Sequence, residues 1–298
     1  MKRLSVMLVL ALGLNAAEHA SFSFVFMTDI HVQPERKAGE GYLETIKTVN
    51  QISPDFVITG DDLIMDALGV RQSRADSLFT MYNDLTQQLG MPVFHTLGNH
   101  EVFGLYEKSG VSPQHPLYGK AMFRHVMGYD RTYHSFDYEG WHFICLDAVA
   151  YTPERRYYGH IDSLQLDWLK SDLAALEPGT PVVVFTHIPF LSVFTQIQQG
   201  ATAGNDSGMV IVNSKPVLEV LNDYNVKLVL QGHLHVVESI QWKNTLFVTG
   251  GAVSARWWTG ARAGFEEGFV VVDINGDELN WRYHELDWHV EPGLYSDD

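Results

Sequence analysis

The stretch "TLGNHEVFG" (residues 96–104) places Gly98, Asn99, His100 and Glu101 in a row directly after an apolar run. The preceding residues, "MPVFH", predict a short strand, and Gly98 would let the chain turn sharply where that strand ends. An amide, an imidazole and a carboxylate are not what packing requires at such a turn, because these groups are costly to bury without partners. The stretch therefore indicates a functional site at a strand end.

Other predicted strands end in polar residues of the same kind. "TDIH" ends the first with Asp29 and His31, two residues apart, so that an extended backbone would point both side chains to one side. The remaining pieces are Gly60-Asp61 in "TGDD", His187 in "FTHIP", and His233 with His235 in "GHLH". Because ligands in open α/β sheets gather at the carboxyl ends of strands, we expect all five pieces to converge on one crevice.

Strand-like and helix-like segments alternate along the chain, which is typical of the α/β class. Strands are predicted at 22–30, 55–63, 91–99, 132–140, 141–149, 181–190, 226–236 and in the closing segment to 286, and helices near 42–52, 74–89, 162–176 and 215–225. No repeat or long linker divides the chain. The pattern predicts one domain, residues 21–298, that holds two sheets between helical layers.

Composition limits the partners. The chain has 298 residues, of which 46% are hydrophobic and 19% charged, and its formal net charge is -16. Such an acidic protein is not expected to bind the nucleic-acid backbone or an anionic membrane surface without a local cationic feature. We expect a small-molecule substrate, and no sequence feature sets an oligomeric state.

The amino-terminal segment carries an export pattern. Lys2 and Arg3 precede an apolar run from Leu4 to Leu14 and small residues at Ala16 and Ala17. The run is shorter than the roughly 20 residues that span a bilayer, so residues 1–20 are predicted to be a cleavable signal peptide, with a retained anchor as the alternative. The mature protein would be periplasmic or secreted, with no membrane span.

The sequence has a single cysteine. Cys145 lies in the apolar run "WHFICLDAV" and has no second thiol in the chain to pair with. An intramolecular disulfide is therefore excluded, and we expect a buried structural thiol.

The residue types at the strand ends indicate metal ions. Carboxylate, imidazole and amide oxygen suit Mn, Fe, Zn or Ni, whereas soft-metal and iron-sulfur sites need thiolates. Seven candidates are too many for one ion and about right for two divalent or trivalent ions that share a carboxylate. Two such ions would stay cationic beside two aspartates and would attract a phosphate. The candidates are Asp29, His31, Asp61, Asn99, His187, His233 and His235.

The five motifs, in this order, resemble those of the calcineurin-like metallophosphoesterases, from about Phe22 to the "GHLH" segment. The resemblance implies a two-sheet β-sandwich flanked by helices, an α/β/β/α arrangement of four layers. It further implies the ligand assignment. One ion would be held by Asp29, His31 and His235, the other by Asn99, His187 and His233, and Asp61 would bridge them.

The resemblance also implies a mechanism. A hydroxide between the two ions would attack phosphorus in line with the leaving oxygen, with Asp61 part of the catalytic centre. Asn99 and His100 would contact the substrate, and His100 would bind a phosphoryl oxygen or protonate the leaving group without binding metal. Glu101 would orient its neighbours.

Departures from related patterns indicate a branch of the family. The second motif reads "GDDLIMD" and lacks the arginine of calcineurin-type protein phosphatases, and Ile64 stands where purple acid phosphatases have a tyrosine. The sequence is more similar to the cyclic-nucleotide-phosphodiesterase-like branch. We therefore predict phosphodiester hydrolysis. The alternatives are phosphomonoester hydrolysis and a non-catalytic module that binds phosphate or a partner through metal.

Several other residues allow two interpretations. His95 is expected to pack in its strand rather than support the site, and Asp62 to cap a turn and face away from the metals. Trp257 and Trp258 would either line the substrate cleft or pack in the core. The insertion at 190–213 is either a specificity loop or a plain connection.

Overall fold

The computed structural model describes residues 21–290. The predicted signal peptide, residues 1–20, lies outside the described residues. Among the helices of residues 21–290, none combines the length and the apolar character that crossing a bilayer requires.

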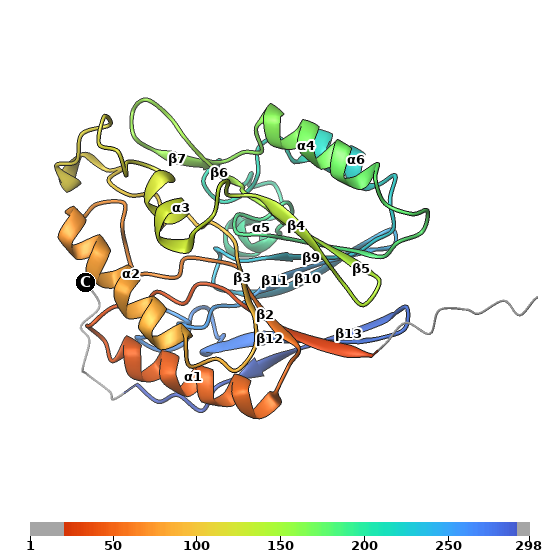
Figure 1. The fold of residues 1–298 in the computed structure, drawn as a ribbon, viewed down its shortest axis with the longest axis horizontal. Helices are drawn as coiled ribbons and strands as arrows, with labels where there is room; N and C mark the ends of the chain where they lie inside the picture. The colour runs from red at the N-terminus through yellow and green to blue at the C-terminus, as the bar shows by residue number, and fades with distance from the viewer. Residues whose placement is uncertain (1–20, 291–298) are drawn as a thin grey trace, which may run out of the picture.

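The first sheet has five strands in the order β13-β12-β1-β2-β3. β1, β2 and β3 are parallel, and β12 pairs antiparallel with β1. Helices α1 (Ala38–Ile52) and α2 (Gln72–Thr86) connect the parallel strands and lie side by side over this sheet (Figure 1). The strands are β1 (Phe22–Met27), β2 (Phe56–Thr59), β3 (Val93–His95), β12 (Gly268–Asn275) and β13 (Glu278–Glu285).

The second sheet has six strands in the order β10-β11-β9-β8-β5-β4. Its four central strands are parallel, and the two edge strands are antiparallel to their neighbours. Helices α4 (Ser163–Leu173) and α6 (Ser214–Leu221) lie on its outer side (Figure 1). The strands are β4 (His134–Tyr138), β5 (Trp141–Leu146), β8 (Val182–Thr186), β9 (Val226–Gln231), β10 (Val237–Trp242) and β11 (Thr245–Gly250).

Shorter elements fill the connections. A small sheet pairs β6 (Val149–Tyr151) with β7 (Tyr157–Gly159). A turn of 3₁₀ helix, η1 (Glu107–Ser109), and helix α3 (Ala121–Met127) follow the "GNHE" segment. The insertion at 190–213 contains helix α5 (Phe194–Gln199).

The two sheets face each other across an apolar core. Along β1, Phe24 and Phe26 point between the sheets, whereas Val25 and Met27 belong to the cluster under the helices, as the two-residue period of a strand requires. The Phe24 ring packs edge-on against Phe143 of β5 at a centroid distance of 5.5 Å. Burial of each such ring stabilises the fold by about 1.5–3 kcal/mol. The predicted order of layers, helix, sheet, sheet, helix, is confirmed.

This architecture places the polar strand ends together. β1 and β2 of one sheet and β8 and β9 of the other are each followed at once by one of the polar motifs. Hydrogen bonds between the two sheets join these ends, from Nδ1 of His187 to the carbonyl of Gly60 and from the amide of His233 to Oδ2 of Asp29. The polar strand ends, which were expected to converge, therefore lie together.

Candidate metal centre

Six residues of the polar motifs have left-handed backbone. Their φ values are 56° for Asp29, 50° for His31, 66° for Asp61, 50° for Asp62, 73° for His233 and 55° for His235. Each such residue costs about 1–3 kcal/mol and is retained where the fold holds it at a functional site. Asp29 and His31 do converge, but sharp turns bring them together. The expectation that strand alternation would do so was wrong.

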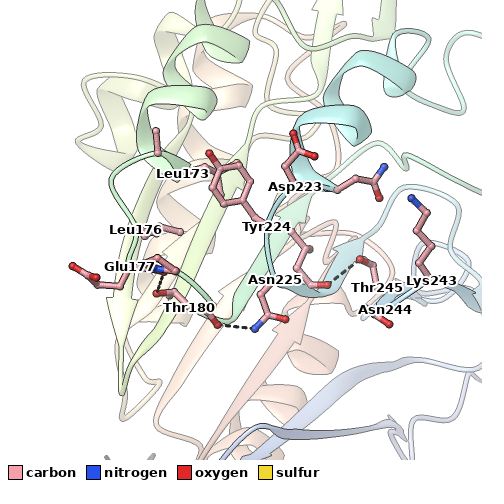
Figure 2. A pocket seen from close by; sticks show the side chains of 15 residues that line it. Leu173, Leu176, Glu177, Thr180, Asp223, Tyr224, Asn225, Lys243, Asn244 and Thr245 are labelled. Carbon is pink, nitrogen blue, oxygen red and sulfur yellow. Dashed lines mark hydrogen bonds between the residues drawn. The ribbon is translucent and has the colours of Figure 1, made fainter.

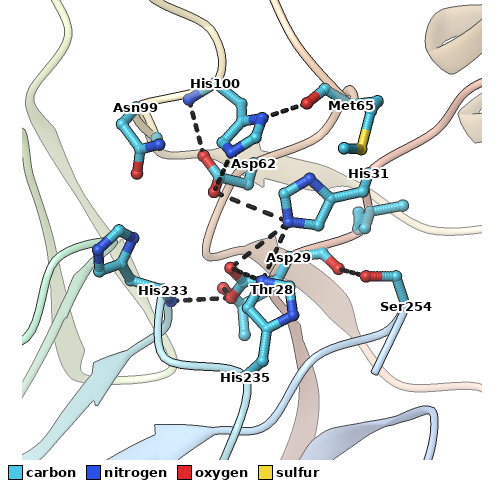
Figure 3. A network of polar contacts seen from close by, with 12 residues as sticks. Thr28, Asp29, His31, Asp62, Met65, Asn99, His100, His233, His235 and Ser254 are labelled. Atoms are coloured by element: carbon cyan, nitrogen blue, oxygen red, sulfur yellow. Dashed lines mark hydrogen bonds and ion pairs between the residues drawn. The ribbon is translucent and has the colours of Figure 1, made fainter. Parts of the chain in front are cut away.

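One group of ligand atoms lies at the end of β1. Nε2 of His235 is 3.0 Å from Oδ1 of Asp29 and 3.1 Å from Nε2 of His31 (Figure 3). All three side chains are buried. Together they could hold one metal ion.

A second group lies beside it and draws on both sheets. Nε2 of His187 is 3.1 Å from Oδ1 of Asn99, 3.1 Å from Nδ1 of His233 and 3.3 Å from Oδ2 of Asp62. Asp62, His187 and His233 could hold a second ion, with the amide oxygen of Asn99 among them.

The carboxylate of Asp62 lies close to both groups of ligand atoms. Its Oδ2 atom, 3.3 Å from His187, is also 3.8 Å from Nε2 of His31 in the first group (Figure 3). The side chain is 3% exposed. Asp62 therefore lies between the two groups of ligand atoms.

Asp61 points elsewhere, so the expected roles of the two aspartates are reversed. Oδ1 of Asp61 accepts a hydrogen bond from Oγ1 of Thr59 at 3.2 Å, and Oδ2 has no partner among the described residues. Burial and the charges of Glu101 and Asp62 raise its pKa well above the usual value. The prediction failed because it assumed an extended backbone at a place where two successive residues are left-handed.

Backbone carbonyls fix the orientation of the histidine rings. Nδ1 of His187 donates to the carbonyl of Gly60 at 2.8 Å, and Nδ1 of His235 donates to that of Ala255 at 2.5 Å. Nε2 of His233 donates to the carbonyl of Gly208 at 2.9 Å. In a neutral ring the proton would be held on the outer nitrogen, so that the inner nitrogen could present its lone pair to a cation.

The resulting cluster of acceptors fits divalent ions. Two nitrogens that are each about 2.1 Å from one ion at adjacent octahedral positions lie about 3.0 Å apart. The distance between Nε2 of His31 and Nε2 of His235 is 3.1 Å, and the distance between Nε2 of His187 and Nδ1 of His233 is also 3.1 Å. Such close approach of lone pairs is favourable when a cation lies between them.

The charges of the site support the same conclusion. Burial opposes ionisation of Asp62, but the nearby His187 and His100 outweigh it and hold the pKa of this carboxyl well below its usual range. Burial lowers the pKa of His187, and Asp62 more than compensates, raising it to about 9. Asp62 is thus an anion that attracts positive charge to the middle of the site.

Two glycines are required by close packing around the carboxylates. A Cβ atom at Gly98 would meet Oδ1 of Asp62 and lie 2.5 Å from the Asp62 amide nitrogen. A Cβ atom at Gly232 would collide with Oγ1 of Thr28 and lie 2.9 Å from Oδ2 of Asp29. The glycines that begin "GNHE" and "GHLH" therefore let the two turns approach the carboxylates.

Glu101 ties the second and third motifs together. Its Oε2 accepts hydrogen bonds from the amides of Gly98 at 3.0 Å and Asp62 at 3.2 Å, and its Oε1 accepts one from the amide of Ile64 at 3.3 Å. Glu101 thus holds the turn that carries Asp62 and the turn that carries His100.

His100 lies at the mouth of the site. Its Nδ1 is hydrogen-bonded to the carbonyl of Met65, and its Nε2 is 3.8 Å from Oδ2 of Asp62 (Figure 3). The side chain is 19% exposed, whereas those of His31 and His187 are fully buried. His100 is therefore partly open to solvent, and its role in catalysis stays a prediction.

The two tryptophans have different places. Trp258 is fully buried and donates from Nε1 to the carbonyl of Ile30 at 2.9 Å. Trp257 lies beside the metal centre, with its ring centroid 5.2 Å from that of His235 and 6.3 Å from that of His31. Trp258 therefore packs in the core, and Trp257 borders the site.

The sequence did not predict two contacts around His233, on the side of the site away from Trp257. The ring of Tyr157, from β7, lies edge-on to His233 at a centroid distance of 6.1 Å. The segment 190–213 reaches the site through the carbonyl of Gly208, which fixes His233. No motif marks a backbone carbonyl, so the sequence carried no signal for this contact.

Residues behind the site behave as expected of a core. Nδ1 of His95 lies 3.1 Å from Oγ1 of Thr59 and takes no part in the ligand groups. Cys145 is buried and unpaired, and burial raises the pKa of its thiol. Both residues therefore pack behind the site, as predicted.

A separate cavity of about 700 Å³ lies at the other end of the second sheet (Figure 2). It is lined by Thr180, Asn225 and Thr245, at or just before the amino ends of β8, β9 and β11. The candidate ligands follow the carboxyl ends of β8 and β9 and do not line it. The cavity is therefore distinct from the candidate metal centre.

The sandwich and the candidate site are typical of the metal-dependent phosphoesterases. The chain belongs to the calcineurin-like phosphoesterase family, whose model matches residues 22–237. A probable cyclic nucleotide phosphodiesterase from Rhodococcus erythropolis is 28% identical over 119 residues, which are 37% of this chain and 34% of that protein. The match thus spans about a third of that relative.

Solved structures share the fold at low identity. A dimetal phosphatase from Danio rerio superposes with a TM-score of 0.62 at 15% identity, covering 88% of this chain and 95% of the other. GAP50, described as the anchor in the inner membrane complex of Plasmodium, gives a TM-score of 0.57 at 16% identity, covering 88% and 84%. At these identities the likeness concerns the fold alone.

Proposed function

We propose that this protein is an exported phosphodiesterase with a dinuclear metal centre. The observation that carries the proposal is the position of Asp62 between two groups of buried ligand atoms. One ion would be held by Asp29, His31 and His235, and the other by Asn99, His187 and His233, with Asp62 shared. Mn, Fe, Zn and Ni all suit these ligands.

When bound, two such ions would supply an activated water and would polarise the phosphoryl oxygens. Residues of the chain would position the substrate and supply a proton to the leaving group. Asn99 and His100 would contact the phosphoryl group. His100, held by the Met65 carbonyl through Nδ1, would present Nε2 to the leaving oxygen and donate a proton as that bond breaks.

A diester is favoured over a monoester by two observations. The curated relative is described as a probable cyclic nucleotide phosphodiesterase. Aromatic side chains border the site on two sides, Tyr157 at His233 and Trp257 at His235, and could contact the two organic groups of a diester. Phosphomonoester hydrolysis at the same centre is the second candidate.

A non-catalytic function is the alternative of another class. The fold also occurs in a protein described as a membrane-complex anchor. A module that binds phosphate or a partner without turnover would keep the ligand groups but would not need His100 at the mouth of the site. The partly exposed position of His100 favours the enzyme.

The test uses protein beginning at residue 21, stripped of metal and reloaded with Mn, Fe, Zn or Ni. Hydrolysis of bis(p-nitrophenyl) phosphate is compared with that of p-nitrophenyl phosphate. We expect metal-dependent cleavage with a higher kcat/KM for the diester. A preference for the monoester would make the protein a phosphatase, and two bound ions without turnover of either ester would favour the binding module.

Export rests on the pattern of residues 1–20 and has its own test. The full-length chain is expressed in a bacterium, cells are fractionated, and the intact mass of the purified protein is measured. We expect a periplasmic or secreted product cleaved near residue 20. Full-length protein in the membrane fraction would instead support a retained anchor.

A further inference from the structure

The loop after β11 holds Trp257 firmly beside the metal centre. Trp258 anchors this loop, because its indole donates to the Ile30 carbonyl at 2.9 Å and its ring fills the space where a side chain at Gly41 would lie. Both tryptophans have left-handed backbone, with φ values of 49° and 65°. Strain of this kind at two bulky residues persists only where the surroundings impose it.

Arg262, from the same loop, packs against the ring of Trp257. Its guanidinium carbon lies 5.3 Å from the centroid of the Trp257 ring, and its Nε donates to the carbonyl of Leu234 at 3.2 Å. Leu234 stands between His233 and His235 in the "GHLH" segment. The arginine is therefore held next to the backbone that carries two candidate ligands.

The terminal amino groups of Arg262 make no hydrogen bond or ion pair with any residue in 21–290. Other arginines in this acidic protein do find carboxylates, as Arg74 does with Glu35 and Arg282 with Asp273, both at 2.6 Å. Burial lowers the pKa of Arg262; the charge of Asp29 opposes this effect, and that of Arg256 adds to it. A half-buried guanidinium whose two terminal amino groups are unused can bind an anion.

We propose that Arg262 binds a second oxyanion of the substrate, a carboxylate or a phosphate on the part of the molecule beyond the scissile phosphoester. The inference rests on the proposed function. The scissile group would already be neutralised by the ions and contacted by His100, and Arg262 forms no ion pair with Asp29 or Asp62 at the centre. The fork of two amino groups matches a planar or tetrahedral oxyanion.

Binding to the manganese-loaded protein tests the proposal by isothermal titration calorimetry. The probes are propylphosphonate, 3-phosphonopropionate, which replaces its terminal methyl by carboxylate, and ethane-1,2-diphosphonate. We expect at least one of the two probes that carry a second acid group to bind wild-type protein about tenfold or more tightly than propylphosphonate. Which of the two gains shows whether the oxyanion is a carboxylate or a phosphate.

Variants separate recognition from structure. The advantage is the affinity of the probe with a second acid group divided by that of propylphosphonate. Arg262→Gln should bring this ratio close to one, and Arg262→Lys should retain part of the advantage. The control Arg282→Gln on β13 should keep all of it. The metal content of each variant checks that its site is intact. If Arg262→Gln does not fold, the probe affinities of Arg262→Lys test the proposal instead. An arginine that only braces Trp257 would leave the advantage unchanged, and that result, or no advantage in the wild type, would overturn the proposal.

Kinetics distinguish failure of the inference from failure of the proposed function. Three p-nitrophenyl diesters are compared, whose retained alcohol is ethanol, choline or 3-hydroxypropionate. We expect kcat/KM to be highest for the anionic ester and lowest for the choline ester, with the spread reduced in Arg262→Gln. Hydrolysis without preference overturns only the role of Arg262, whereas hydrolysis of none overturns the proposed function and the inference together.

Discussion

Oδ2 of Asp62 lies 3.3 Å from Nε2 of His187, and the carboxylate of the neighbouring Asp61 belongs to none of the ligand groups. Asp62→Ala is therefore expected to lose metal and to lower kcat/KM by more than the roughly 10- to 100-fold typical of a residue that only orients a ligand. Asp61→Asn is the matched variant and should keep two ions per chain. Metal analysis beside the diester assay checks both, and the opposite ranking would return the bridging role to Asp61.

His100 is expected to act on the leaving group. His100→Asn should retain both metals while the rate falls by about 100-fold or more, as for other lost acid catalysts. The loss should be greater for a phenyl diester than for a p-nitrophenyl diester, because p-nitrophenolate leaves readily without a proton. An equal loss on both esters would instead place His100 in phosphoryl binding.

Gly98 has no room for a side chain. In Gly98→Ala the new methyl group would press on Asp62 and on Oε2 of Glu101, which lies 2.9 Å from the Cβ position. We expect a destabilisation of about 1–3 kcal/mol together with reduced metal binding. Gly90→Ala is the control, since its nearest atom would be Oδ1 of Asn50 at 3.6 Å. Urea denaturation and metal titration of both variants measure the difference, and equal behaviour would refute the packing argument.

Glu267 predicts a pH dependence of stability away from the metals. The side chain is fully buried, neither carboxylate oxygen has a hydrogen-bond partner among the described residues, and burial raises its pKa from 4.5 to about 7. Because the folded state then binds more protons than the unfolded state between these values, the free energy of unfolding should fall as pH rises from about 4.5 to 7.

Glu267→Gln should remove this dependence. At pH 8 the variant is expected to be more stable than wild type by up to about 3 kcal/mol, and at pH 4.5 the two should differ little. Glu266→Gln, at the exposed neighbouring position, serves as the control. Urea denaturation at the two pH values measures the effect. An equal gain at both would show that the carboxyl of Glu267 is not held protonated.

Much of the fold follows from the sequence. The alternation of Phe24 and Phe26 with Val25 and Met27 distinguishes the face between the sheets from the face under the helices. A short motif after each central strand then marks one edge of the sandwich. These patterns are local, and the short connections of an α/β chain leave few other ways to join them.

The details of the site do not follow from the same patterns. The aspartate that faces the ions depends on the left-handed backbone at Asp61 and Asp62, which hydrogen bonds from distant segments impose, such as those to Glu101. Likewise, Trp257 and Trp258 are adjacent in sequence, and only the packing around Gly41 decides which of them is buried. Long-range contacts therefore decide these roles.

We infer that Asp62 bridges two metal ions. Anomalous diffraction from crystals of the manganese- or zinc-loaded protein tests this role most directly. We expect two anomalous peaks about 3.5–4 Å apart, one beside Asp29, His31 and His235 and one beside Asn99, His187 and His233, with the Asp62 carboxylate between them. A single peak, or two peaks bridged by another residue, would contradict it.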